Sequence, residues 1–256
     1  MSLEMFSLKG RNALVTGSSQ GIGWSIAKAY ALAGAHVILN GRNEDKLKKA
    51  AERLKKEHGV TVSLKAFDVT DAEAVKKGVE EIEREVGAIH ILVNNAGMQS
   101  RKPLEEFDSK IWQQILDLNL TSIFTVSQAV VQGMIKRGEG KIINICSLMS
   151  EVGRFSIAPY TASKGGLKML TKGMCVDWAR HNIQVNGIGP GYFATEMNTA
   201  LVEDPKFTSW LEQRTPAQRW GNVEELEGAA IFLASPAANF VNGHILYVDG
   251  GVLASL

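Results

Sequence analysis

The 256-residue sequence has few cysteines, no long apolar run and almost no net charge. Its two cysteines, Cys146 and Cys175, lack a CxxC spacing and have no metal-ligating partners nearby, which fits a reducing cytoplasm better than a disulfide framework. No apolar run approaches the length of a membrane span, and the N-terminus has no signal-peptide pattern. With a net charge of only +1, the protein has little overall electrostatic attraction to nucleic acid or to an acidic membrane surface. We therefore expect a cytoplasmic protein that binds neither.

Metal-ligand patterns and basic patches are also missing. The five histidines are scattered and form no HxxxH pair, so we expect no metal site. The most basic stretch, DKLKKAAERLKKEHG (45–59), has acids among its lysines. This mixture indicates a solvated helix face rather than a nucleic-acid patch.

What the sequence does contain is a regular alternation of β-branched runs and helical patterns. Strands are expected at 12–17, 36–40, 62–69, 89–97, 141–147, 183–191 and 244–251. Helical patterns lie between nearly all of them, for example at 22–33, 44–57, 72–86, 109–136 and 160–180. The alternation predicts a single-domain α/β protein over residues 1–256, with a Rossmann-like doubly wound parallel sheet of about seven strands and helices on both faces. Residues 192–221 interrupt the alternation, so we expect a lid or substrate loop there.

The first strand runs directly into a glycine-rich turn, TGSSQGIG (16–23). Gly17, Gly21 and Gly23 would let the backbone approach a pyrophosphate closely at a helix N-terminus. The spacing is GxxxGxG rather than GxGxxG, but the turn follows a strand and opens a helix, as phosphate binding requires. The turn therefore indicates a dinucleotide cofactor.

The end of the second strand indicates which dinucleotide is bound. An NAD-binding chain would carry an acid here for the adenosine ribose, but the sequence reads ILNGRN (38–43). Arg42 offers a planar cation that suits a 2′-phosphate, although an ordinary turn arginine is the alternative. We therefore expect NADP(H), with NAD(H) as the weaker alternative.

Tyr160 and Lys164, in APYTASKGG (158–166), are four residues apart and would share one helix face. In isolation an exposed pair is the simpler interpretation. In a catalytic setting, the Lys164 ammonium would lower the pKa of the Tyr160 phenol and make it a usable base.

Together with NNAG (94–97) and Ser147, these motifs resemble the short-chain dehydrogenase/reductase family over essentially the whole chain, from Leu8 to Gly251. The resemblance implies that Tyr160 is the general acid/base, that Lys164 assists it and contacts the nicotinamide ribose, and that Ser147 donates to the substrate oxygen. It also implies that Asn119, in LDLNLTS, holds a water of the proton relay.

The resemblance extends to the cofactor cleft and to the assembly. It implies a homotetramer that associates through the helices at 109–136 and 160–180 and through the C-terminal strand. The cofactor residues that motif or resemblance implies are Gly17, Ser19, Gln20, Gly21, Ile22, Gly23, Asn40, Arg42, Asp68, Val69, Asn95, Ala96, Gly97, Tyr160, Lys164, Pro190, Gly191 and Thr195.

Several segments, among them PYTASKGGLKMLTKGM and FVNGHILYVDGG, are similar to family members that act on sugar acids. This narrower resemblance implies reversible oxidation of D-gluconate at C5. Two positions depart from it: Ser100 where relatives often carry an arginine, and Met149 where they carry a glutamine. The departures leave another polyol, keto acid or hydroxy acid open. The candidate substrate residues are Gln99, Arg101, Ser147, Glu151, Arg154 and Tyr160.

Two other functions use the same motifs. An NADPH-dependent carbonyl reductase of the 3-oxoacyl-thioester type would favour an apolar cleft and a basic patch for an acidic carrier protein, which the near-neutral charge does not support. A non-catalytic NADP(H)-binding regulatory protein ranks lower, because Asn119, Ser147, Tyr160 and Lys164 are all present.

Overall fold

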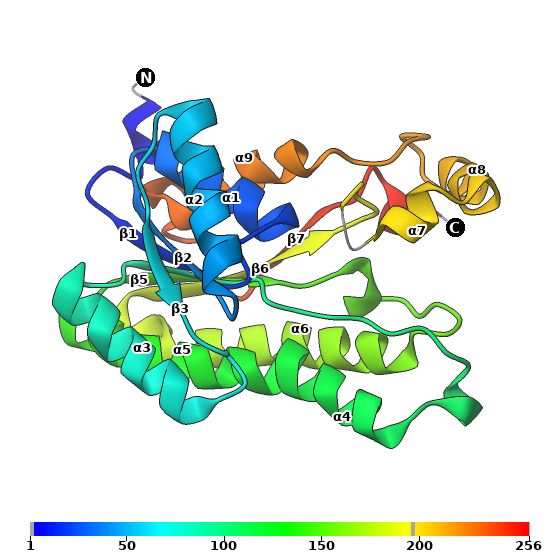
Figure 1. The fold of residues 1–256 in the computed structure, drawn as a ribbon, viewed down its shortest axis with the longest axis horizontal. Coiled ribbons are helices and arrows are strands. Elements are labelled where there is room, and N and C mark those ends of the chain that lie inside the picture. Colours follow the sequence, from blue (N-terminus) through cyan, green and yellow to red (C-terminus); the bar gives the residue numbers. More distant parts are fainter. Residues whose placement is uncertain (1–2, 196–197, 256) are drawn as a thin grey trace.

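The computed structural model describes residues 3–195 and 198–255, and these form three layers around one sheet (Figure 1). Seven strands, all parallel, lie in the order β3-β2-β1-β4-β5-β6-β7. The order reverses between β1 and β4, and this switch point is where an open α/β sheet binds its ligand. The fold predicted from the sequence is thereby confirmed. The strands are β1 (Asn12–Val15), β2 (His36–Gly41), β3 (Ser63–Ala66), β4 (Ile91–Asn94), β5 (Gly140–Ile145), β6 (Ile183–Pro190) and β7 (Ile245–Val248).

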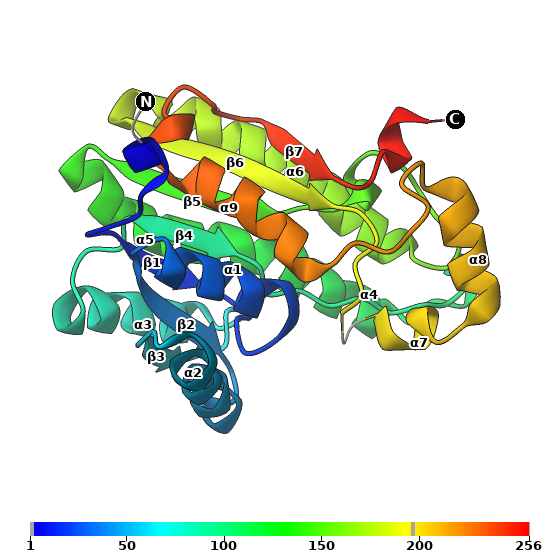
Figure 2. The same ribbon diagram turned by 90° about the horizontal axis from the view of Figure 1, so that it is seen from above.

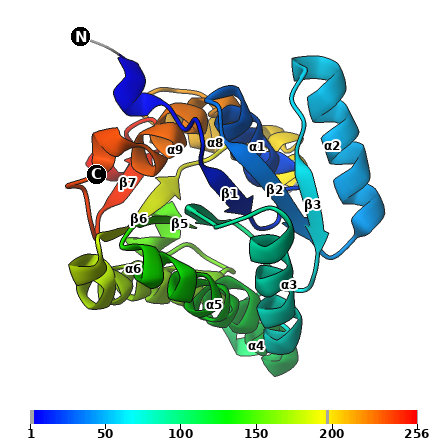
Figure 3. The ribbon, with the colours of Figure 1, turned by 90° about the vertical axis from the view of Figure 1, so that its left-hand side faces the viewer.

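Helices cover both faces of the sheet (Figure 3). One layer holds α1 (Gly21–Leu32), α2 (Glu44–His58) and α9 (Glu227–Ala234). The other holds α3 (Ala72–Glu85), α4 (Ser109–Leu116), α5 (Ser122–Arg137) and α6 (Ala158–Trp178). Because both faces are covered, every residue of β4 and β6 is buried, including the polar Gln184 and Asn186 of β6.

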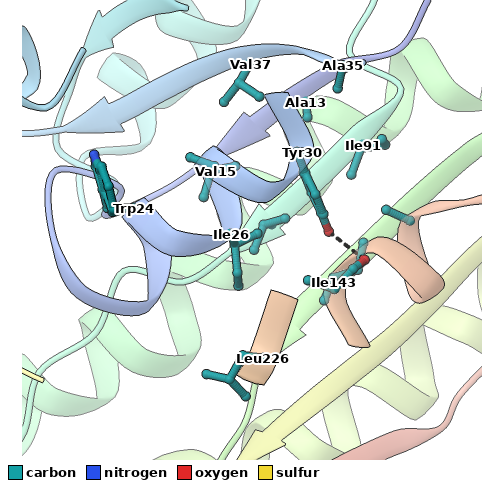
Figure 4. Packing of buried hydrophobic residues seen from close by; sticks show 14 of the residues in the cluster. Ala13, Val15, Trp24, Ile26, Tyr30, Ala35, Val37, Ile91, Ile143 and Leu226 are labelled. Atoms are coloured by element: carbon teal, nitrogen blue, oxygen red, sulfur yellow. Dashed lines mark hydrogen bonds between the residues drawn. The ribbon is translucent and has the colours of Figure 1, made fainter. Parts of the chain in front are cut away.

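The core on the α1 side shows how the layers are joined (Figure 4). Ile26 and Tyr30 of α1 pack against strand residues such as Val15 and Val37. The Tyr30 hydroxyl is fully buried and donates a hydrogen bond of 3.0 Å to the Ala230 carbonyl of α9, so its polar group is satisfied. This packing fixes α1, whose N-terminus opens toward the carboxyl ends of the strands.

Helix ends follow from local sequence signals. Asn43, Asp71, Asp108 and Asp204 each accept hydrogen bonds from first-turn backbone N–H groups of the helix that follows. Gly59 and Gly138 take left-handed conformations at the C-terminal ends of α2 and α5. The boundaries of α2, α3 and the run from α4 to α5 agree closely with the sequence patterns, whereas the helix that Asp204 caps was not predicted.

The helix expected at 109–136 is present as a single helical run. A π-helical turn at Asp117–Thr121 connects its two α-helical parts, α4 and α5. Among the described residues, this run, Ser109–Arg137, is the one helix that is long and apolar enough to cross a membrane, judged by length and composition alone. Its apolar residues, such as Val126, Val130 and Met134, are buried against the sheet. Its composition is therefore that of a core helix.

The interruption expected at 192–221 carries two short helices, α7 (Thr199–Val202) and α8 (Pro205–Arg214). They lie beyond the carboxyl ends of the strands (Figure 2). The two ends of the segment are joined by a bridge between Phe193 and Gly221, with hydrogen bonds from Ala194 N to Gly221 O and from Gly221 N to Tyr192 O. We call residues 194–220 the lid segment; its residues 196–197 lie outside the described ranges.

Candidate active site

A cleft of about 450 Å³ lies at the carboxyl ends of the strands and is bordered by the lid segment. Most residues predicted from the sequence line it. These are Gly17, Ser19, Gln20, Gly21, Ile22, Asn40, Arg42, Asp68, Val69, Asn95, Ala96, Gly97, Gln99, Arg101, Ser147, Arg154, Tyr160, Lys164, Pro190, Gly191 and Thr195. Gly23, Asn119 and Glu151 are the predicted residues that do not.

The glycine-rich turn between β1 and α1 forms one end of the cleft. Gly17 has a φ of +61°, and a Cβ there would come within 2.9 Å of the Ala96 Cα. The Asn95 side chain donates to the carbonyls of Thr16 (3.0 Å) and Gly17 (2.9 Å), so the NNAG segment holds the turn in place. Gly23 packs beneath this contact, since a Cβ on it would collide with the Asn95 amide. The exposed N-terminus of α1 is thus available to a phosphate.

The end of β2 presents cations. Arg42 lines the cleft with its side chain 76% exposed, and its Nη1 lies 3.7 Å from an Asp68 oxygen. Burial opposes ionisation of Asp68, but hydrogen bonds from Thr70 and the charge of Arg42 hold its pKa below the usual value. Lys46, in the first turn of α2, also borders the cleft and was missed by the sequence interpretation. The sequence did carry a signal for Lys46: it lies four residues after Arg42, in the first turn of the helix that Asn43 caps.

The catalytic candidates converge from β5 and α6. Ser147 follows β5, and its hydroxyl accepts a hydrogen bond from Met149 N at 3.1 Å. Pro159 lies in the first turn of α6, which begins just before Tyr160. Lys164 is 4% exposed; its ammonium donates to the Ile145 carbonyl at 2.6 Å and lies 5.7 Å from the centroid of the Tyr160 ring. The three side chains line one cleft.

The protonation of this group differs from the expectation. Burial raises the pKa of Tyr160, and the hydrogen bond with Ser147 offsets only part of that increase. Burial also lowers the pKa of Lys164 to about 8. The prediction of a net lowering of the phenol pKa is wrong for this structure, because burial outweighs the opposing contributions and the Lys164 ammonium donates to the Ile145 carbonyl.

Asn119 lies in the π-helical turn and is fully buried. Its Nδ2 donates to the Met98 carbonyl (2.8 Å) and to the Ser163 hydroxyl (3.1 Å), and its Oδ1 accepts from Met98 N (2.8 Å). Both amide protons are therefore used, and one lone pair of Oδ1 remains for a water. Through Met98 and Ser163, Asn119 therefore connects the segment that follows β4 with α6, behind the cleft.

Two guanidinium groups occupy the end of the cleft nearest the lid segment. The Arg154 guanidinium lies over the Phe207 ring at 4.5 Å and 5.8 Å from the Trp210 ring, both on α8. Burial and the charge of Arg154 lower the pKa of Arg101. Neither arginine forms an ion pair with any described residue. Two neighbouring cations that pair with no acid in the described part of the chain favour an anionic ligand.

Glu151 is placed away from the cleft. Lys168 on α6 and Tyr247 on β7 both bind its carboxylate, with oxygen contacts of 2.5–2.6 Å. Its position in the sequence, between Ser147 and Arg154, suggested that it contacts the substrate. The turn after β5 directs its side chain away from the cleft instead.

Several other lining residues were missed. They are Gly41, Asn43, Phe67, Met98, Leu118, Ile145, Cys146, Leu148, Ile157, Tyr192, Phe193, Asn198 and Leu201, whereas Met149, noted from the sequence as a departure from relatives, also lines the cleft. Most are apolar, and an apolar residue after a strand carries no signal that separates a cleft wall from the core.

Comparison with known proteins gives matches along the whole chain. The family profile described as enoyl-(acyl carrier protein) reductase matches residues 17–253. Over 253 residues the chain is 56% identical to the gluconate 5-dehydrogenase of Gluconobacter oxydans 621H, covering 99% of this chain and 98% of that protein. It is 53% identical to the 5-keto-D-gluconate 5-reductase of Escherichia coli K12, with 99% of each covered. The structure of a gluconate 5-dehydrogenase from Burkholderia cenocepacia J2315 in complex with NADP and tartrate superposes with a TM-score of 0.97, at 53% identity and 100% coverage of both chains. The similarity therefore includes the cleft and the lid segment.

Proposed function

Because the chain belongs to the short-chain dehydrogenase/reductase family, we propose that it catalyses the reversible NADP-dependent oxidation of D-gluconate at C5 to 5-dehydro-D-gluconate. The chain is an NAD(P)-dependent oxidoreductase that acts on CH–OH groups. The observation that carries the substrate proposal is the pair Arg101 and Arg154, which lines the same cleft as Ser147 and Tyr160. Gluconate has the matching parts, a carboxylate at one end and a row of hydroxyl groups.

NADP(H) fits the cleft. The glycine turn at Gly17 leaves room for close backbone approach at the N-terminus of α1. At the end of β2, Arg42 and Lys46 line the cleft and Asn40 and Gly41 stand where an acid would repel a 2′-phosphate. When bound, the nicotinamide supplies the hydride acceptor or donor.

The reacting oxygen is handled by Ser147 and Tyr160. In oxidation, Tyr160 takes the hydroxyl proton as general base; in reduction, it returns the proton to the carbonyl oxygen. The Ser147 hydroxyl donates to the same oxygen as charge develops on it. Lys164 supplies a buried positive charge beside the phenol, and Asn119 can hold a relay water through its remaining lone pair.

The gluconate carboxylate would bind between Arg101 and Arg154, with Gln99 toward the hydroxyl groups. An anion in this position removes the repulsion between the two guanidinium groups, which lowers the pKa of Arg101 in their present arrangement. The same two cations argue against a 3-oxoacyl-thioester substrate, whose acyl chain would favour an apolar wall here.

We extend the proposal to the assembly and the compartment. Apolar side chains on the outer faces of α5 and α6 are exposed: Phe124 by 47%, Met169 by 60% and Val176 by 78%. Burial of these side chains between copies supports a homotetramer. Cys146 and Cys175 are both free, which supports a reducing cytoplasm.

The test is the initial rate of cofactor reduction at alkaline pH with D-gluconate, other aldonates and polyols, each with NADP⁺ and with NAD⁺. We expect the fastest NADP⁺ reduction with gluconate. Background rates with gluconate, together with rapid NADPH oxidation by a keto ester or thioester, would reject gluconate and favour a carbonyl reductase.

A further inference from the structure

The carboxylate of Glu151 joins three elements behind the cleft. Glu151 follows the 3₁₀ turn Leu148–Ser150, which comes directly after Ser147. The Lys168 ammonium of α6 contacts both carboxylate oxygens, and the Tyr247 hydroxyl of β7 donates to Oε1 at 2.6 Å. The Glu151 side chain is 32% exposed and that of Lys168 23%. These three residues do not line the cleft, so their contacts are not made for the substrate.

The turn between Ser147 and Glu151 leaves little freedom between the two residues. Ser150 N donates to Ser147 O at 3.0 Å, and Glu151 N donates to Leu148 O at 2.9 Å. The Ser150 hydroxyl also donates to the Lys164 carbonyl at 2.9 Å. A displacement of Glu151 is therefore transmitted to Ser147 through a single hydrogen-bonded turn.

The same helix carries the other catalytic groups. Tyr160, Lys164 and Lys168 are spaced four residues apart on α6 and so lie along one side of it. Because Lys168 binds Glu151, the turn that carries Ser147 is bound to α6 two helical turns beyond Tyr160. The contact from Tyr247 binds the same carboxylate to the sheet.

We propose that Glu151, bound by Lys168 and Tyr247, is a positioning residue that holds Ser147 against the phenol of Tyr160. This inference rests on the proposed roles of Ser147 and Tyr160, but it does not depend on which sugar acid is the substrate. Ser147 and Tyr160 line the same cleft, and the Ser147 side chain lowers the pKa of Tyr160 against the effect of burial. When Ser147 moves away, the phenol therefore ionises at higher pH.

The test is the pH dependence of kcat for oxidation in Glu151→Ala. Oxidation needs the phenolate, so kcat rises with pH through the pKa of the phenol. We expect this kinetic pKa to increase by about one unit, the size expected for loss of one hydrogen bond to a charged oxygen. Below that pKa kcat then falls about tenfold, and the difference from wild type narrows as pH rises. Binding of NADPH, followed by its fluorescence, should not change.

Three further variants separate positioning from simple loss of an ion pair. Glu151→Gln keeps an oxygen for Tyr247 and a polar group for Lys168, so it should recover most of the activity. Glu57→Ala is the matched control, because it removes another ion pair, Arg53–Glu57 at 3.1 Å near the C-terminal end of α2, and neither residue lines the cleft. Adding Glu151→Ala to Ser147→Ala should leave the kinetic pKa of Ser147→Ala unchanged, since the group being positioned is already absent.

The outcomes are distinct. A kinetic pKa equal to that of wild type in Glu151→Ala would overturn the proposal, as would equal shifts in the presence and absence of Ser147. A higher KM for the acid substrate with an unchanged pH profile would instead make Glu151 a substrate contact. If wild type does not oxidise gluconate, the proposed substrate fails, and the same variants are measured on the substrate that gives the fastest NADP⁺ reduction. If Glu151→Ala does not fold, Tyr247→Phe removes one contact and should give a smaller shift in the same direction.

Discussion

Burial raises the pKa of the Tyr160 phenol, and the Lys164 ammonium beside it donates to the Ile145 carbonyl. We expect Tyr160→Phe to lower kcat by about 10²–10⁴-fold, the usual contribution of a general acid/base. NADPH binding should be retained, because only a hydroxyl is removed. Steady-state rates and a fluorescence titration of NADPH test this together. Turnover within about threefold of wild type would exclude Tyr160 as the acid/base, since no such contribution would have been lost.

We propose that Arg42 favours NADP(H) both through its own charge and because no carboxylate stands beside it at the end of β2. The residues before it are Asn40 and Gly41, so no carboxylate ends β2; the nearby acid is Asp68, 3.7 Å from Arg42. We expect Arg42→Ala to raise the KM for NADP⁺ about 10- to 100-fold, since a hydrogen bond to a charged group contributes about 1.5–3 kcal/mol.

The KM for NAD⁺ should change little in the same variant, because NAD⁺ lacks the 2′-phosphate. Lys46→Ala is the companion variant and should have a smaller effect in the same direction, since Lys46 is a point charge without the planar fork. Equal increases for NADP⁺ and NAD⁺ would show that Arg42 does not contact the 2′-phosphate.

At the scale of elements, the lid segment is joined to the cleft through aromatic rings. Tyr192 contacts Phe207, Trp210 and Trp220 edge-on, with ring centroids 5.8–6.1 Å apart. Phe207 also carries the Arg154 guanidinium on its face. The orientation of α8 and the position of Arg154 are therefore linked.

Phe207→Leu keeps an apolar side chain on α8 but removes the ring face beneath Arg154. We expect the KM for gluconate to rise two- to fivefold, since a cation–π contact at a partly exposed site is worth about 0.5–1 kcal/mol. The KM for NADP⁺ should stay the same. Trp220→Phe is the control. Trp220 belongs to the same aromatic cluster, but the Arg154 guanidinium lies over Phe207 and Trp210 instead. Equal changes in both variants would show that the cluster acts on the lid segment and not through Arg154.

At the scale of the whole molecule, the proposed tetramer depends on the outer faces of α5 and α6. We expect Met169→Glu to shift the protein to smaller species, because a charge would have to be buried between copies. Light scattering during size-exclusion chromatography measures the mass. Leu32→Glu is the control: Leu32 is similarly exposed, at 56%, but lies on α1 in the opposite layer. Dissociation by Leu32→Glu alone would move the proposed interface to that layer.

The sequence by itself determined the alternation of strands and helices, the glycine turn and the cation after the second strand. Each of these is local. A parallel strand buried on both faces must be apolar along its length, a helix start needs a cap such as Asn43 or Asp71, and a close phosphate approach needs Gly17. Strand ends were predicted too long, as at 89–97 where β4 is Ile91–Asn94, because the flanking residues are also withdrawn from solvent: Ile89 is fully buried before the strand, and residues 95–97 line the cleft after it.

Only the tertiary structure decided the directions of side chains and the protonation of the catalytic group. Glu151 lies four residues from Ser147, yet the turn between them directs it to Lys168 and Tyr247 and away from the cleft. Lys46 reaches the cleft because α2 begins beside the end of β2. The pKa of Tyr160 is raised because burial outweighs its hydrogen bond with Ser147. Spacing along a chain places residues near one another, but turn geometry and burial determine which of them meet and which carry charge.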